Sequence, residues 1–173
     1  VLFNPWHQDD DFISYSDGTV TNVNQGKFYS TIQAAVNEAN PGDTIQVAAG
    51  TYYESVTISK SITLTGDCGE ENTPGPGKNA PILDGTGQGD HKYGFYIVGD
   101  NAHDVVIEGF EIKNFNGAEA SGIFGHCVGV NNITVRYNYI HDVAAHGVRA
   151  FNAYEEESMT GWAVTHNVIE KFG

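Results

Sequence analysis

The chain has 173 residues, which is enough for one domain with a substantial hydrophobic core. Twenty-two acidic residues against eight basic ones give a formal net charge of −14 at pH 7, the wrong sign for binding nucleic acid or an anionic membrane surface. The sequence contains no apolar run of about 18 residues, so we expect no membrane span.

Residues 1–28 contain several turn residues but little periodicity, and we interpret them as an N-terminal arm. The run Asp9-Asp10-Asp11 has oxygen ligands suited to Ca²⁺, but no glycine-punctuated ligand loop follows it, so a solvated acidic turn is the alternative. No other cofactor is implied. Because the chain begins VLFNPWHQ, without Met or a signal-like segment, we expect an extracellular or cell-surface protein whose signal peptide has been removed.

A helix is predicted over about residues 30–40. Ser30 and Gln33 fit a capping box, with Ser30 as the N-cap. The helical spacing of four apolar residues predicts one buried face, formed by Ile32, Ala35, Val36 and Ala39. Pro41-Gly42 ends the helix. A single amphipathic helix at this place is expected to cover the open apolar end of the structure that follows.

From Asp104 the chain repeats one pattern three times: DVVIEGFEIKNF, NITVRYNYIHDV from Asn132 and GWAVTHNVIEKF from Gly161. Apolar residues two apart indicate strands with one buried face, and a repeat of about 28 residues is typical of a solenoid. Between the copies, GFYIVG (94–99), SGIFGHC (121–127) and HGVRAFN (146–152) add a third strand per turn. We therefore predict an all-β fold, a parallel β-helix of about five coils.

The β-helix domain is expected to cover residues 29–173, with loop insertions at about 66–80 and 87–93 that interrupt the repeat. Loops on a rigid scaffold are frequent binding sites. Asn138 and Asn167 are in register, so we expect them to stack as an asparagine ladder along the solenoid.

The run YSTIQAAVNEANPGDTIQVAAGTYYESVTISKSITLTGD (29–67) and the later repeats resemble right-handed parallel β-helix proteins of the pectin-lyase-like superfamily, pectinesterases among them. The resemblance covers about residues 29–173 and is carried by core and corner positions. It implies a polysaccharide-binding groove along one sheet, with a basic residue and Ca²⁺ or basic groups in a lyase, or paired aspartates in an esterase or glycosidase. Neither aspartate set is found here.

The remaining catalytic candidates are concentrated in the last two coils: His126, His141, His146 and Arg149. A histidine and an arginine on one face fit a base and a uronate clamp, although polar residues are also ordinary at outward strand positions. Seven tyrosines predicted to face outward are candidates for stacking on sugar rings or on a protein partner: Tyr52, Tyr53, Tyr93, Tyr96, Tyr137, Tyr139 and Tyr154.

Cys68 and Cys127 are the two cysteines, and they form either a disulfide, if the chain is secreted, or two buried thiols. Asn132-Ile133-Thr134 matches a glycosylation sequon, but because its last two residues lie in a predicted strand we interpret it as a chance match.

Three functions follow from these observations. The first is a non-catalytic extracellular subunit of a surface layer, sheath or filament, which self-associates through an uncovered last coil ending at Lys171-Phe172-Gly173. The second is a lyase or epimerase acting on acidic polysaccharides. The third is a carbohydrate-binding module. Few bases and no recognisable catalytic set favour the first.

Overall fold

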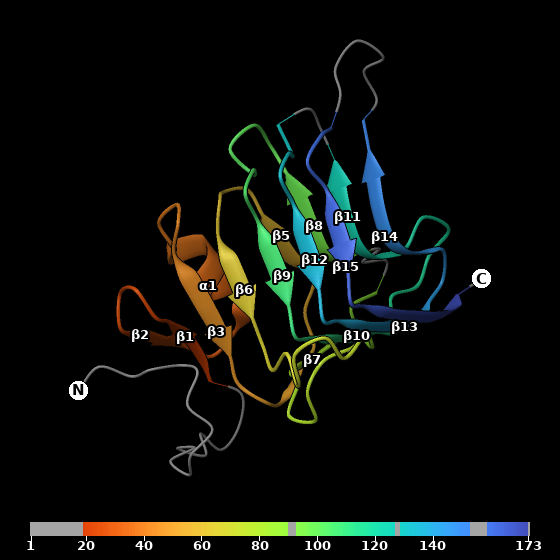
Figure 1. The fold of residues 1–173 in the computed structure, drawn as a ribbon, viewed down its shortest axis with the longest axis horizontal. Helices are drawn as coiled ribbons and strands as arrows, with labels where there is room; N and C mark the ends of the chain where they lie inside the picture. The colour runs from red at the N-terminus through yellow and green to blue at the C-terminus, as the bar shows by residue number, and fades with distance from the viewer. Residues whose placement is uncertain (1–18, 90–92, 127–128, 153–158, 173) are drawn as a thin grey trace.

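The structure is a computed structural model that describes residues 19–89, 93–126, 129–152 and 159–172. Its strands wind into a parallel β-solenoid of four complete turns, with a fifth begun by the last two strands (Figure 1). The predicted fold class, an all-β parallel β-helix with an N-terminal capping helix, is confirmed. The described residues include no helix long and apolar enough to cross a membrane.

Three sheets form the walls of the solenoid. The parallel strands of sheet A are β3 (Thr44–Val47), β6 (Thr63–Thr65), β9 (Val106–Glu108), β12 (Thr134–Arg136) and β15 (Ala163–Thr165). Those of sheet B are β4 (Thr51–Tyr52), β7 (Ile82–Asp84), β10 (Glu111–Lys113), β13 (Tyr139–Val143) and β16 (Val168–Phe172). Those of sheet C are β5 (Val56–Ile58), β8 (Tyr93–Val98), β11 (Ser121–His126) and β14 (His146–Phe151).

The core consists of apolar ladders that run along the solenoid axis. On sheet A one ladder places residues of five successive strands in register: Ile45, Leu64, Ile107, Val135 and Val164. The first four of these side chains are 0% exposed. Leu64, Ile107 and Val135 each lie between two coils, and Ile45 lies between the second coil and the N-terminal strand Val20–Asn22. Stacking identical positions is what buries a continuous core in a chain with such short strands.

Each repeat contains three residues with a left-handed backbone, and these residues form the corners between its strands. The corners therefore recur with the period of the repeat. The corner positions of the last three repeats are Asp104, Asn132 and Gly161; Gly109, Tyr137 and His166; and Asn114, Asp142 and Lys171. At the second corner, the buried Asn138 donates to the carbonyl of Ile107 (3.0 Å) and to Oδ1 of Asn167 (3.1 Å), and its own Oδ1 accepts from the amide of Phe110 (3.0 Å). The predicted asparagine ladder is therefore confirmed.

The capping helix α1 (Ile32–Glu38) packs its buried residues Ile32, Ala35 and Val36 over the first coil. The N-cap is Thr31, so the predicted capping box with Ser30 is wrong. Thr31 has the extended backbone of an N-cap, and its Oγ1 accepts from the amide of Ala34 (3.1 Å). Gln33, expected to complete the box, instead bonds the backbone of Thr57 on β5.

Part of the predicted N-terminal arm belongs to sheet A. Strands β1 (Val20–Asn22) and β2 (Lys27–Tyr29) form an antiparallel hairpin, and β1 pairs with β3. The hairpin is fixed by Asp43, whose carboxylate accepts from Asn22 Nδ2 (2.8 Å), Gln25 Nε2 (2.7 Å) and the amide of Asn40 (2.9 Å). Hairpin and helix together cover the N-terminal end of the solenoid (Figure 1).

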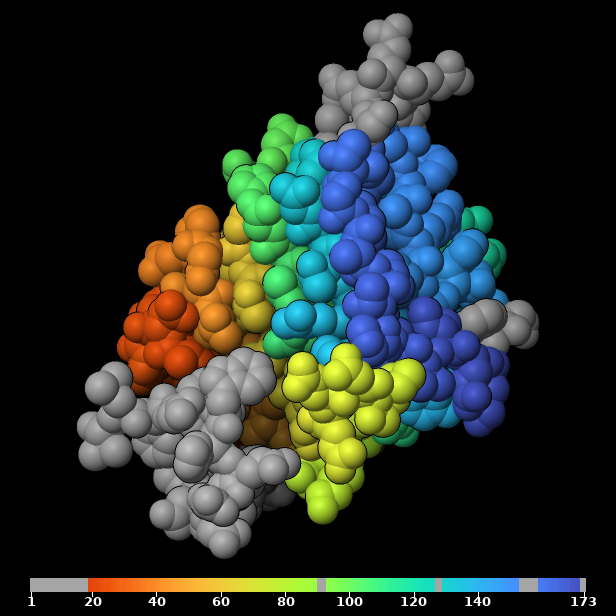
Figure 2. All heavy atoms as spheres, viewed as in Figure 1, coloured from red at the N-terminus to blue at the C-terminus, as the bar shows by residue number. Residues whose placement is uncertain are grey.

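Loop 66–80 lies over sheet B and reaches the last coil. Its base is held by Asp67, which accepts from the amides of Gly69 (3.0 Å) and Asn79 (3.0 Å) through its carboxylate. Its tip is tied to the corner of the last coil by a hydrogen bond from the amide of Gly75 to the carbonyl of His166 (2.8 Å). Figure 2 shows the yellow residues of this loop beside the dark blue residues of the last coil.

Candidate functional site

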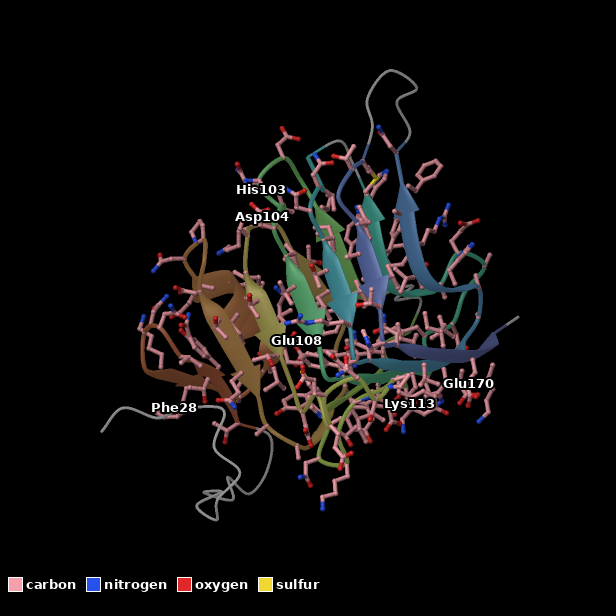
Figure 3. All side chains as sticks on the ribbon, in the orientation of Figure 1. Phe28, His103, Asp104, Glu108, Lys113 and Glu170 are labelled. Carbon is pink, nitrogen blue, oxygen red and sulfur yellow. The ribbon has the colours of Figure 1, made fainter. Side chains whose placement is uncertain are left out.

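The outer face of sheet B carries a ladder of charged residues. Asp84, Lys113, His141 and Glu170 occupy matching positions on β7, β10, β13 and β16. Because parallel strands in register stack their side chains along the solenoid axis, these four form one continuous row. Figure 3 shows Lys113 and Glu170 on the outer side of this sheet.

Two residues of the neighbouring ladder, Glu111 and Tyr139, connect this row. Glu111 Oε1 lies 2.9 Å from Lys113 Nζ and 3.2 Å from His141 Nε2. The Tyr139 hydroxyl donates to Glu170 Oε1 at 2.6 Å. The sheet therefore presents a connected network of carboxylates, a phenol and cations rather than separate side chains.

His141 is a buried member of the network, with 8% of its surface exposed. Its Nδ1 lies 2.5 Å from Asp142 Oδ2, its Nε2 faces Glu111, and its ring stacks on that of Tyr139 with 4.1 Å between centroids. Both ring nitrogens and one ring face of His141 are in contact with neighbouring side chains. His141 therefore holds the side chains of Tyr139 and Glu111 in position.

Two ionisable groups beside His141, the Glu111 carboxyl and the Tyr139 phenol, have pKa values that are shifted away from neutral pH. Burial alone would raise the pKa of the Glu111 carboxyl, but hydrogen bonds from Lys113 and His141 outweigh burial and lower that pKa below its ordinary value. In the opposite direction, the hydrogen bond to Glu170 raises the pKa of Tyr139 to about 12. At neutral pH the site therefore combines an ionised carboxylate with a protonated phenol, and neither is poised to exchange a proton.

A groove of about 480 Å³ lies between loop 66–80 and this network, and we call it the sheet B groove. The loop contributes one wall through Pro74–Lys78 and Ala80. Sheet B contributes the other through Ile82, Glu111, Tyr139, Val168 and Glu170. The groove thus combines apolar side chains with hydrogen-bonding groups at an open surface.

Sheet C carries a different surface, an aromatic strip formed by Tyr93, Tyr96, Phe124, His126, Arg149 and Phe151. The rings stack in two directions: the His126 ring is 5.5 Å from that of Phe124 on the same strand and 6.1 Å from that of Phe151 on the next strand, β14. The Arg149 guanidinium lies over both phenylalanine rings, at 5.1 and 5.2 Å, and pairs with Glu119. These contacts cover part of the ring surface, and Phe151, on the last strand of sheet C, is 43% exposed.

The four residues predicted as catalytic lie on two sheets. His126 and Arg149 both lie in the aromatic strip of sheet C, on the same face, as predicted. Nδ1 of His126 is 3.1 Å from the hydroxyl of Tyr96. His146 is an exposed residue at the start of β14, opposite Ser121. His141 lies on sheet B, so the four do not form one cluster.

Ser61, His103 and Asp104 look like a nucleophilic triad but lack its geometry. Ser61 Oγ and Asp104 Oδ2 lie 3.2 and 2.7 Å from the same atom, Nδ1 of His103. A triad needs the serine on one ring nitrogen and the acid on the other. Figure 3 places His103 and Asp104 together on an exposed corner, and we assign them no catalytic role.

Five predicted site residues lie outside the described residues: Asp9, Asp10, Asp11, Cys127 and Tyr154. The calcium site and the disulfide therefore stay predictions. Cys68 is half-buried, and this burial is the main cause that raises the pKa of its thiol to about 11. Tyr52, predicted to face outward, is only 5% exposed and donates to the carbonyl of Ala48 within the core, so that prediction was wrong. Within the described residues, no three His, Cys, Asp or Glu side chains are grouped to hold a metal ion.

The sequence did not identify Glu111, Glu170 or Lys78 as site residues. The repeat length places Glu111, Tyr139 and Val168 in one ladder, so register alone could have found the sheet side of the groove. The repeat does not predict the path of loop 66–80, which crosses three coils outside the repeating strands.

Comparison with protein families gives a match to the family described as "Protein of unknown function (DUF1565)", over residues 16–171. No curated protein and no solved structure matches the chain.

Proposed function

The chain belongs to the DUF1565 family, and we propose that it binds a polysaccharide chain in the sheet B groove without cleaving it. The observation that carries this proposal is the lining of the groove. Glu111 and Glu170 are acceptors for sugar hydroxyls, and Lys78 is a donor. Ile82, Val168 and the prolines of loop 66–80 offer apolar surface to the C–H faces of sugar rings.

Binding fits the chemistry of the site better than turnover does. General acid–base catalysis is efficient when the pKa values of the acid and the base lie near the working pH. In the groove the pKa of Glu111 is lowered and that of Tyr139 is raised to about 12, so both shifts move away from neutral pH. A fixed carboxylate and a fixed phenol are well suited to hold hydroxyl groups in one geometry.

The proposal is tested by calorimetric titration with a panel of hexasaccharides, using Tyr139→Phe as the first variant. The loss of one hydroxyl at the groove is expected to weaken binding about three- to tenfold, because one hydrogen bond contributes about 0.5–1.5 kcal/mol. Tyr96→Phe, which removes a hydroxyl from sheet C, is the matched control and is expected to bind as the unmodified chain does. Equal binding by both variants, or no binding to any hexasaccharide, contradicts the proposal.

A second proposal, self-association through the last coil, is supported by one exposed core position. Val164 is 44% exposed, whereas the other four members of its ladder are 0% exposed. We propose that the last coil of a second copy covers it. At the opposite end, the exposed residues include the polar Asn37 and Glu38 of α1 and the apolar Val23 and Phe28 of the hairpin. The arrangement that we propose is a two-fold dimer, in which the last coils of two copies meet and bring the same apolar position together.

Light scattering over a range of concentrations tests this second proposal. The mass is expected to double as concentration rises, and Val164→Lys is expected to abolish the increase. Val23→Lys is the matched control, because Val23 is 53% exposed at the other end of the molecule. A monomer at every concentration, or equal loss of association in both variants, would show that the last coil is not a dimer contact.

A further inference from the structure

The charges around the sheet B groove point to the class of its ligand. Resting on the proposed function, we infer that the groove accepts uncharged polysaccharides and rejects chains of uronic acids, with Glu111 and Glu170 as the residues that discriminate between them. The inference opposes what the superfamily resemblance implies, because that resemblance leads to acidic substrates. Four observations support it.

First, the sheet wall of the groove carries two carboxylates. Glu111 and Glu170 both line the space in which a ligand would lie. A uronate carboxylate entering this space meets like charges at short range, where the repulsion is least screened by salt. A neutral sugar meets the same oxygens as hydrogen-bond acceptors.

Second, the loop wall does not compensate for these charges. Lys78 is the one basic residue among the described residues that line the groove. The same loop contributes Asp67 and the exposed Glu70 and Glu71, so it has more acidic than basic groups. Two other cations lie near the groove, Lys113 beside Glu111 at 2.9 Å and Lys171 beside Glu170 at 3.8 Å. Neither lysine lines the groove, whereas both carboxylates do, so a ligand in the groove meets the carboxylates first.

Third, both arginines of the sequence are bound elsewhere. Arginine recognises carboxylates through paired hydrogen bonds, which makes it the preferred clamp for a uronate. Arg136 bonds Glu108 on sheet A at 2.6 Å. Arg149 pairs with Glu119 and lies over Phe124 on sheet C. No arginine is therefore placed to bind an acidic sugar in the sheet B groove.

Fourth, the net charge of −14 adds a long-range repulsion against any polyanion. This term acts on the whole protein and weakens as salt is added, whereas the repulsion by Glu111 and Glu170 is local. The two effects can be separated by comparing variants that change the net charge equally but at different places.

The matched probes are hexagalacturonate and its fully methyl-esterified form, which share ring and linkage and differ in charge. They are titrated alongside cellohexaose, mannohexaose and hexaguluronate, in low salt and with EDTA to remove divalent bridges. The best neutral hexamer is expected to bind at least about tenfold more tightly than either acidic one, because two like-charge pairs are avoided.

Glu170→Gln is the decisive variant, and Glu38→Gln is its control. Both remove one negative charge, but Glu38 lies on α1, where it pairs with Lys27. Glu170→Gln is expected to reduce the preference for the neutral hexamer about threefold or more. Glu38→Gln is expected to leave that preference unchanged. A change of equal size in both variants would assign the selectivity to net charge and overturn the role of the groove carboxylates.

The remaining outcomes separate the two proposals. If an acidic hexamer binds as tightly as the best neutral one and Tyr139→Phe weakens it, the groove binds polysaccharides but the inferred selectivity is wrong. If none of the hexamers binds, the proposed function is itself overturned, and the inference with it.

Discussion

The first coil and the last described coil carry the same apolar ladder but end it in different ways. At the first coil, Ile45 is fully buried beneath the hairpin β1–β2 and helix α1. At the last coil, Val164 occupies the same register and is 44% exposed. A core position of the repeat is therefore buried only where a neighbouring layer covers it. Equivalent positions contribute differently to the free energy of unfolding according to what covers them.

The two ends also differ in how the segments beside them are attached. Helix α1 is held by the Glu54 carboxylate, which accepts from the amides of Ile32 (2.8 Å) and Gln33 (2.9 Å). At the other end, loop 66–80 reaches the last coil through the amide of Gly75, bonded to His166. We expect the N-terminal end to unfold with the whole domain and the last coil to open locally at lower free energy.

The largest expected effect compares Val135→Ala with Val164→Ala, the same change in adjacent coils of one ladder. Val135 is fully buried, so its replacement is expected to lower the free energy of unfolding by about 2–3 kcal/mol through lost burial and a cavity. Val164→Ala is expected to cost less than about 1 kcal/mol because its side chain is already partly in water. Urea denaturation measures both. Equal losses would mean that the last coil is covered in solution.

The next effect concerns the attachment of the cap. Glu54→Ala removes the acceptor of two helix amides and is expected to cost about 1–2 kcal/mol, with faster hydrogen exchange at Ile32 and Gln33. Glu38→Ala is the control, because its ion pair with Lys27 is exposed and contributes little. A Glu54 variant as stable as the control would show that packing alone holds the helix in place.

The sequence predicted those features of the fold that repeat. The spacing of Ile107, Val135 and Val164 gives the coil length, and the register of Asn138 and Asn167 gives the asparagine ladder, because both depend on stacking identical positions. Features that occur once were not predictable in the same way. The acceptor Glu54 lies between β4 and β5, more than twenty residues after the start of the helix that it holds. The N-cap Thr31 is adjacent to Ser30, a residue of similar capping preference.

The candidate site was predicted only in part for the same reason. Periodicity placed His126 and Arg149 on one sheet, and it also brings Glu111 beside Tyr139. It does not say which outer face is covered by a loop, and loop 66–80 lies over sheet B rather than sheet C. The residues chosen as catalytic from their chemical type therefore fall on two faces, while the groove forms where the insertion happens to lie.

A smaller effect tests the attachment of loop 66–80 with two glycines of similar backbone. Gly75 (φ +94°) is tied to the last coil, and Gly42 (φ +91°) follows α1 at the other end. Alanine at either position is expected to cost about 1 kcal/mol of backbone strain. Only Gly75→Ala is expected to speed hydrogen exchange in β16, because the bond to His166 is disturbed. Protection of β16 unchanged in both variants would show that the loop does not hold the last coil.

The smallest expected effect is the pH dependence supplied by Asp43 at the covered end. The hydrogen bond from Asn22, aided by those from Gln25 and the amide of Asn40, lowers the pKa of Asp43 below its ordinary value. A carboxyl whose pKa is lower in the folded state stabilises the fold above its ordinary pKa, near pH 4, and loses that contribution as pH falls through the folded-state value.

The urea midpoint is therefore expected to fall more between pH 6 and pH 3 in the unmodified chain than in Asp43→Asn. Asp100→Asn, which alters an exposed loop aspartate, is the control and is expected to follow the unmodified chain. If Asp43→Asn shows the full acid loss, the hydrogen bonds to Asp43 are as strong with a neutral acceptor as with a carboxylate. The covered end would then owe its stability to the burial of Ile32, Ala35 and Val36, and the two ends of the solenoid would differ in packing alone.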